Sequence, residues 1–150
     1  MNTVTRFQLR SASHLFLVRD DKILLGRRKG AWKAGYYSVP AGHLDGEETA
    51  AGAMLREAKE ETDVEMERSD LRLVHVSHRK ALECEYIDFF FEAIKWKGNP
   101  KIMEPDKCDD LSWYKFNALP ENTVAYIREA IEKYRQGILY SESGWNGDAE

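Results

Sequence analysis

The segment GHLDGEETAAGAMLREAKEETDV, residues 42–64, is the most informative part of this chain. Within it, Glu57, Glu60 and Glu61 stand at i, i+3 and i+4, positions that share one face of a helix. Like charges held this close repel one another unless a cation lies among them, and hard divalent ions prefer such oxygen ligands. The spacing leaves two interpretations open: a metal-binding helix, or an acidic helix face in solvent that neighbouring basic side chains balance.

A second face of the same helix carries Ala51, Leu55 and Ala58, which predict close packing against a sheet. Alternating and β-branched residues predict the strands, and Gly or Pro residues separate them. The predicted strands are 12–18, 22–28, 38–39, 71–77, 85–96 and 111–116, and the predicted helices are 45–62 and 122–136. This order predicts the fold class α/β (α+β), with a mixed sheet between helices and a hairpin turn at 19–21. Residues 141–150 are expected to form a loosely held tail.

The composition is that of a globular protein with one core: 150 residues, 43% hydrophobic and 32% charged. A formal net charge of −4 gives no global basic field, so we expect no nucleic-acid polymer as a partner. An acidic protein that handles phosphates would need local cations or metal ions. Cys84 and Cys108 form no C-x-x-C pair and are expected to be reduced thiols. Without a signal-peptide pattern or a long apolar run, the expected location is cytoplasmic, away from membranes.

The wider spacing of the segment is more specific than the carboxylates alone. The pattern runs Gly42, five residues, Glu48, seven residues and then REAKEETDV. It resembles the Nudix box, in which a glycine stands at the position of Asp63. That glycine ends the helix in the left-handed conformation, which aspartate tolerates better than most residues. A second departure is Ala41, where a glycine is common. Neither change removes a charged position, so we expect the chemistry to be retained.

The resemblance extends beyond the box, over roughly residues 12–137. Residues 23–30 (ILLGRRKG) resemble the strand ahead of the box in MutT-type members. The stretch EPDKC at 104–108, followed by Trp113 and Leu119-Pro120, resembles a segment of nucleotide-directed MutT-like diphosphatases. The resemblance implies a single Nudix hydrolase domain over residues 1–150, with the Nudix α/β/α sandwich, a mixed sheet between helices and the box at 42–64.

The resemblance also implies roles for individual residues. The three box glutamates are expected to bind Mg²⁺ (or Mn²⁺), and one of them is expected to take a proton from water. Glu104 is a further ligand or general base, with an ordinary loop residue as the alternative, and Arg56 is expected to pair with nearby glutamates and fix their rotamers. The candidate catalytic residues are Glu57, Glu60, Glu61, Glu104 and Arg56. The candidate metal ligands are Ala41, through its carbonyl, and Glu57, Glu60, Glu61 and Glu104.

Five residues are candidates for binding the substrate. Arg27 and Arg28 follow each other on a strand, where side chains alternate between faces, so only one is expected to face the site. Tyr37 and Ser38 precede the box, and Tyr126 lies on the last predicted helix, from which it could stack on a base. For each of these residues, a role in packing is the alternative.

Two classes of function compete. The first is a magnesium-dependent, MutT-like nucleoside di- or triphosphate pyrophosphohydrolase, in which water attacks phosphorus; the substrate could also be another nucleoside-diphosphate-linked compound or a non-nucleotide diphosphate. The second is a non-catalytic Nudix-fold module that binds a ligand, which the complete set of box carboxylates disfavours. Residues 76–82 (VSHRKAL) lack the proline of ADP-ribose-directed members and the tyrosine of dinucleoside-polyphosphate members. The expected partner is therefore a small-molecule nucleotide or related diphosphate, with a homodimer as an open alternative.

Overall fold

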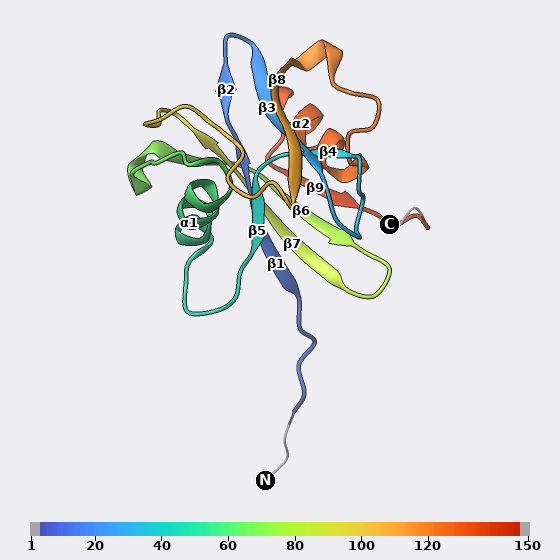
Figure 1. Cartoon of the computed structure of the whole chain (residues 1–150). Coiled ribbons are helices and arrows are strands. Elements are labelled where there is room, and N and C mark those ends of the chain that lie inside the picture. The colour runs from blue at the N-terminus through green and yellow to red at the C-terminus, as the bar shows by residue number, and fades with distance from the viewer. Residues whose placement is uncertain (1–3, 148–150) are drawn as a thin grey trace.

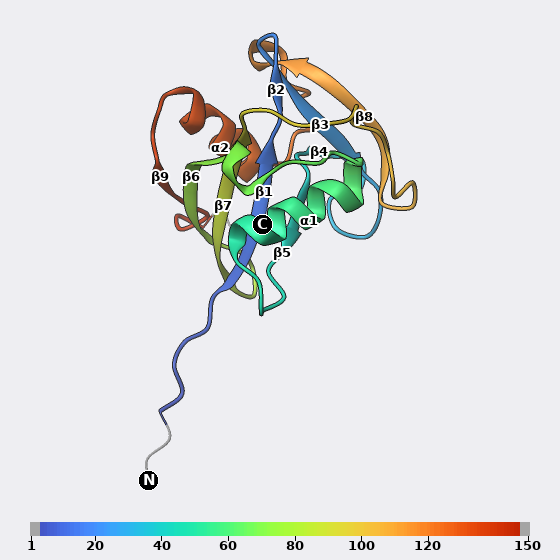
Figure 2. The same cartoon turned by 90° about the vertical axis from the view of Figure 1, so that its left-hand side faces the viewer.

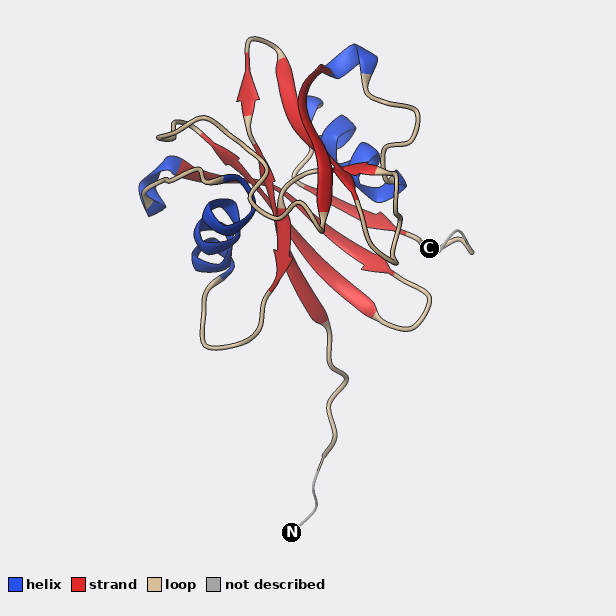
Figure 3. Ribbon diagram, viewed as in Figure 1, coloured by secondary structure: helices blue, strands red, loops and turns tan. Residues whose placement is uncertain are grey.

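The structure is a computed structural model that describes residues 4–147. Strands dominate it, and the first described residues extend away from the body (Figures 1 and 3). The elements in chain order are β1 (Arg10–Phe16), β2 (Val18–Arg19), β3 (Lys22–Arg28), β4 (Tyr37–Ser38), β5 (Ala41–His43), α1 (Ala50–Thr62), the 3₁₀ turn η1 (Arg68–Asp70), β6 (Leu71–Lys80), β7 (Glu85–Ala93), β8 (Cys108–Lys115), the 3₁₀ turn η2 (Phe116–Ala118), α2 (Ala125–Arg135) and β9 (Tyr140–Ser143).

The larger sheet has five strands in the order β5-β1-β7-β6-β9. β1 pairs antiparallel with β5 and parallel with β7, so that His14 stands between Ala41 on one side and Phe90 on the other. β6 pairs antiparallel with β7, where Arg79 lies opposite Tyr86, and β9 pairs in parallel with the far side of β6. The short strand β5, which leads into α1, is therefore one edge of this sheet.

The smaller sheet is built around β3, which pairs antiparallel with β2, β4 and β8. Asp20 and Asp21 connect β2 to β3 with φ angles of 52° and 62°. Two successive left-handed residues are what a two-residue hairpin turn requires, and aspartate accepts this conformation. The hairpin predicted at 19–21 is confirmed.

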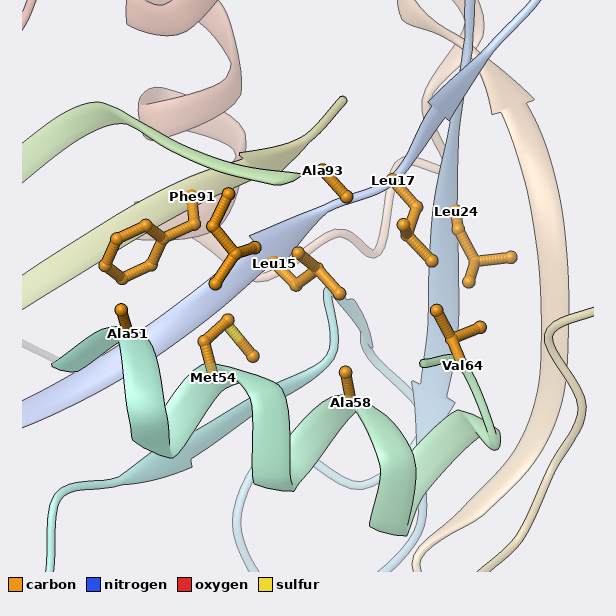
Figure 4. Packing of buried hydrophobic residues seen from close by; sticks show 10 residues of the cluster. Leu15, Leu17, Leu24, Ala51, Met54, Ala58, Val64, Phe91 and Ala93 are labelled. Carbon is orange, nitrogen blue, oxygen red and sulfur yellow. The ribbon is translucent and has the colours of Figure 1, made fainter. Parts of the chain in front are cut away.

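The two α-helices cover opposite faces of the sheets (Figures 1 and 2). Alternation along the end of β1 and into the next residue, Leu17, divides the core between them. Leu15 and Leu17 pack with Met54 of α1, as Figure 4 shows, while Phe16 packs with Ile127 of α2. All five side chains are fully buried. Burying side chains of this size contributes roughly 1.5–3 kcal/mol each. The mixed α/β class with helices on both sides, predicted from the sequence, is confirmed.

Both ends of α1 are defined by specific residues. The helix begins at Ala50, later than predicted, because Gly46 (φ 91°) and Glu47 (φ 59°) adopt left-handed conformations that a helix cannot include. Thr49 caps it by accepting a hydrogen bond from the Gly52 N–H at 2.9 Å. At the other end Asp63, with φ 60° and ψ 28°, takes the left-handed position usually filled by glycine. The expectation for Asp63 is confirmed.

The C-terminal segment is more ordered than predicted. Residues 140–143 form β9, which pairs in parallel with β6, so the predicted loose tail begins inside a strand. His75 of β6 helps to hold this segment, since its ring nitrogens lie 2.7 Å from the Ile138 carbonyl and 2.8 Å from the Ser141 hydroxyl. The end of the predicted tail, residues 148–150, lies outside the described residues. Within residues 4–147, no helix is long and apolar enough to span a membrane.

Candidate active site

A cavity of about 720 Å³ lies where β3, β5, α1 and the loop before β8 meet the α2 side of the larger sheet. It brings together most of the residues that the sequence analysis selected. Those that line it are Arg27, Arg28, Ser38, Ala41, Glu57, Glu61, Glu104 and Tyr126. Glu60, Arg56 and Tyr37 are not among the lining residues.

Glu57 packs directly over Gly42 of β5. A Cβ atom added at Gly42 would fall on the carboxyl group of Glu57, well inside the 3.0 Å that real Cβ contacts respect. The box glycine is therefore needed here for space. Burial raises the pKa of Glu57, and the adjacent Arg56 guanidinium partly opposes this shift.

Glu61 is the carboxylate most strongly affected by its surroundings. Its Oε2 accepts a hydrogen bond from the Ala41 N–H at 3.0 Å, which ties α1 to β5. Burial, together with repulsion from Glu57 and Glu104, raises the pKa of Glu61 to about 8, although the Ala41 hydrogen bond opposes the shift. Glu57, Glu61 and Glu104 therefore act on one another electrostatically around a single cavity.

Arg56 organises the outer side of this carboxylate group. Its Nε–H and Nη2–H groups donate to both oxygens of Glu48, at 3.1 and 2.7 Å, and its Nη1–H donates to Glu57 at 2.8 Å. The same Nη1 lies 3.4 Å from Glu60, whose side chain is 52% exposed. Glu48 and Arg56 thus hold Glu57 against Gly42, while Glu60 lies on the solvent side of the helix.

The opposite wall of the cavity supplies cations. Arg27 and Arg28 both line it, so the prediction that only one would face the site is wrong. The physical reason is a register shift in the β3–β8 pairing between these two residues, which breaks the strict alternation. Arg27 donates to Asp109 at 2.6 Å, and Arg28 lies 4.7 Å from the centre of the Trp32 ring. Lys29 and Lys107 line the cavity too, the latter 3.2 Å from Glu104.

Tyr37 and Ser38 occupy different environments. Ser38 lines the cavity, as a substrate-binding residue should. Tyr37 is buried away from it, and its hydroxyl donates to Asp110 at 2.6 Å. The geometry therefore corrects the assignment of Tyr37: it packs in the α2-side core beside Tyr114 instead of facing a substrate.

A polar network on the α2 side of the cavity is not among the residues predicted from the sequence. Arg79, 8% exposed, donates from Nε to Asp88 at 2.7 Å. The guanidinium carbon lies 4.3 Å from the ring centre of Tyr86 and 3.8 Å from that of Tyr126. Along β6 the alternate residues His75, Ser77 and Arg79 are buried, and because all three are polar, no apolar alternation in the sequence marks them as inward-facing. The predicted strand stopped at residue 77, so Arg79 was left outside the pattern.

The described residues contain no ready-made cluster of three His, Cys, Asp or Glu side chains able to hold a metal ion. Glu57 instead accepts a hydrogen bond from Arg56, and Glu61 accepts one from the Ala41 N–H. The donor set nevertheless suits a hard divalent ion: Glu57 and Glu61 supply carboxylate oxygens, and burial, together with repulsion from neighbouring carboxylates, raises the pKa of both, a shift that a bound cation would oppose.

Comparisons with known proteins agree on one family. A family model described as NUDIX domain matches residues 8–134. A curated relative, the NAD-capped RNA hydrolase NudC of Pseudomonas putida (strain W619), is 31% identical over 134 residues, which cover 85% of this chain. The chain spans only 46% of that relative's length.

Solved structures give the same result. The MutT NUDIX hydrolase from Burkholderia pseudomallei superposes with a TM-score of 0.77 at 31% identity, over 83% of this chain and 97% of that one. The MutT protein of Methanosarcina mazei Go1 shares the fold, with a TM-score of 0.74 at 19% identity, over 89% of this chain and 97% of that one. The family match, the box on α1 and the shared fold show that the chain belongs to the NUDIX domain family.

Proposed function

We propose that this chain is a MutT-like pyrophosphohydrolase that cleaves a diphosphate linkage in a nucleoside di- or triphosphate, with Mg²⁺ (or Mn²⁺) as cofactor. The observation that carries the proposal is the cavity in which the partly buried Glu57 and Glu61 are lined up with a basic wall. Carboxylates alone would repel a diphosphate, and cations alone would bind it without activating water. The juxtaposition suits an anionic substrate that enters together with a divalent ion.

Glu57, Glu61 and the Ala41 carbonyl are the groups that we propose would hold the ion, with Glu104 as a further ligand or general base. The chemistry that such an ion supplies is neutralisation of phosphate oxygens and a lower pKa for water. Glu60, which the sequence analysis gave the same role, is half exposed beside Arg56 and would have to turn inward to join them.

The remaining residues position the substrate and the carboxylates. Arg27, Arg28, Lys29 and Lys107 supply the local cations that an acidic protein needs in order to bind phosphates. Arg56, which Glu48 fixes on its other side, holds the Glu57 rotamer. Water is the nucleophile, and one of the cavity carboxylates takes its proton.

A substrate panel tests this proposal. Nucleoside di- and triphosphates are incubated with purified protein, together with NAD⁺ because of the NudC resemblance, and released phosphate and diphosphate are measured. Turnover should disappear with EDTA and return with excess Mg²⁺ or Mn²⁺. Full activity in EDTA would refute the metal requirement, and no turnover of any compound would favour a ligand-binding module.

Variants locate the chemistry within the cavity. Glu57→Gln and Glu61→Gln keep the shape of the side chain and remove its charge, so kcat should fall on the order of 100-fold or more. The matched control is Glu65→Gln, just beyond α1, where the carboxylate is 60% exposed and pairs with Lys59. Near-normal kcat in either cavity variant would remove that residue from the site.

Isotope labelling identifies the bond that breaks. Hydrolysis in ¹⁸O-water should place the label in one phosphate-containing product and none in the sugar. With a nucleoside triphosphate, the MutT resemblance favours attack at the β-phosphorus, with label in the released diphosphate. Label at carbon, or a trapped phosphoryl-enzyme, would contradict attack by water on phosphorus.

A further inference from the structure

The strongest unexplained feature of the cavity is Arg79, a buried arginine that the proposed chemistry does not use. It lines the same cavity as Glu57 and Glu61, yet it lies on β6, on the far side of β1 and β7 from β5. Its guanidinium is fixed beside Asp88 of β7. Two strand spacings separate β7 from β5, which places this group roughly 10 Å from the strand that carries Ala41.

The neighbours of Arg79 leave it little freedom to move. Asp88 is fully buried and accepts from Nε at 2.7 Å and from Nη2 at 3.3 Å. The rings of Tyr86 and Tyr126 lie against the guanidinium. Tyr126 is itself positioned by His14, whose Nε2 lies 3.3 Å from the tyrosine hydroxyl. A polar group held this rigidly loses little conformational entropy when it binds a ligand.

The donors of Arg79 are only partly used. A guanidinium has five N–H groups, and Asp88 takes one from Nε and one from Nη2. No hydrogen bond joins Nη1 to any described residue. The Nη1–Nη2 edge therefore retains two parallel donors, a geometry that matches two adjacent acceptors.

The charge around Arg79 indicates which kind of acceptor fits. Asp88 already neutralises the guanidinium, and burial lowers the pKa of the nearby His14, which keeps that imidazole neutral. A further phosphate would gain little from a neutral pair, whereas uncharged acceptors would satisfy the two donors without adding buried charge.

We infer that Arg79 recognises the base of the substrate nucleotide through two neutral acceptors on one edge, the pattern that O6 and N7 of guanine or hypoxanthine present. This inference rests on the proposed function, because it places the phosphates near α1 and the base over β7. Adenine carries an amino group in place of O6, and this N–H donor would face an N–H donor of Arg79. A purine oxidised at C8 carries a hydrogen on N7 and loses one of the two contacts.

The test compares ITP with ATP, two nucleotides that differ on this purine edge. In the wild-type protein, kcat/KM should favour ITP on the order of tenfold or more. Arg79→Lys retains a cation beside Asp88 but lacks the planar fork, so the ratio should approach one. The control is Arg72→Lys, an exposed arginine on the same strand, which should leave the ratio unchanged. Because each ratio is measured on one preparation, it does not depend on the folded fraction.

Binding of the monophosphates separates this inference from the proposed function. Titration calorimetry in EDTA should show IMP binding more tightly than AMP in the wild type and not in Arg79→Lys. If the wild type shows this preference for IMP but hydrolyses no nucleotide, the proposed function is contradicted and base recognition by Arg79 is supported. Equal treatment of the two bases by the wild type, or a preference that survives in Arg79→Lys, would overturn the inference.

Discussion

Replacing Gly42 with alanine should impair catalysis while the protein stays folded. The added Cβ would occupy the space of the Glu57 carboxyl group, inside 3.0 Å, whereas ordinary contact begins near 3.4 Å. Glu57 must therefore retreat by about 1 Å, and a displacement of that size in an active site costs on the order of 100-fold in rate. Gly42 does not adopt the left-handed conformation, so backbone strain adds nothing to the effect. The overpacking itself should cost about 1–3 kcal/mol of stability, which an ordinary domain survives.

The assay is kcat with the best nucleotide from the substrate panel, alongside thermal unfolding followed by circular dichroism. Gly52→Ala, in the same box, is the matched control. Its Cβ would meet only the Thr49 hydroxyl, at 3.1 Å, and alanine favours a helix over glycine by about 1 kcal/mol. This control should keep near-normal kcat and stability. Wild-type kcat in Gly42→Ala would refute the reasoning, because it would mean that the position of Glu57 does not matter.

Three further predictions concern stability. Asp63→Gly should change the free energy of unfolding by less than about 1 kcal/mol in urea titrations, because glycine adopts the left-handed conformation more easily and this gain offsets the lost surface ion pairs. Asp63→Val should lower the free energy of unfolding by about 1–2 kcal/mol, because a β-branched residue is strained in that conformation. The hydrogen bond from the Tyr37 hydroxyl lowers the pKa of Asp110 in the folded protein. Ionised Asp110 therefore stabilises the fold fully above the pKa that it has in the unfolded chain, and this stabilisation is lost as pH falls through its lower pKa in the folded protein. The stability difference between the wild type and Asp110→Asn should therefore be constant near neutral pH and shrink as pH falls below about 5 and onward past the unfolded pKa; a difference that stays constant in acid would contradict the assignment. Saturating Mg²⁺ should raise the Tm of the wild type by several degrees, since a ligand at about 100 times its Kd stabilises the folded state by about 2.7 kcal/mol. The same Mg²⁺ concentration should raise the Tm of Glu61→Gln less.

The sequence predicted best where local rules agree with one another. The box spacing predicted α1 as the helix that carries the carboxylates, and the left-handed preference of aspartate predicted the conformation of Asp63. The same reasoning placed the helix start too early, because Glu47 is a residue that favours helices but here has a positive φ. Local propensity could not reveal that the chain turns there before Thr49 caps the helix.

The features that were missed depend on contacts between distant segments. Arg27 and Arg28 both reach the cavity because β8 pairs with a shifted register, and no pattern within β3 contains that information. Arg79 is buried because Asp88 lies beside it on the next strand, 9 residues away along the chain. A charged residue in a strand is usually exposed, so only the structure identifies this one as an interior group.

The placement of β9 has a consequence for how the C-terminus can be manipulated. A four-residue strand covers the outer side of β6, whose ten residues would otherwise present a long row of unpaired amide and carbonyl groups to solvent. Trimming the chain after Gly137 would remove that cover and deprive His75 of both of its partners. The exposed strand would then be a template for pairing with other molecules. Shortened versions of this protein should aggregate even though every residue of the cavity is still present, and affinity tags are safer placed at the extended N-terminal end.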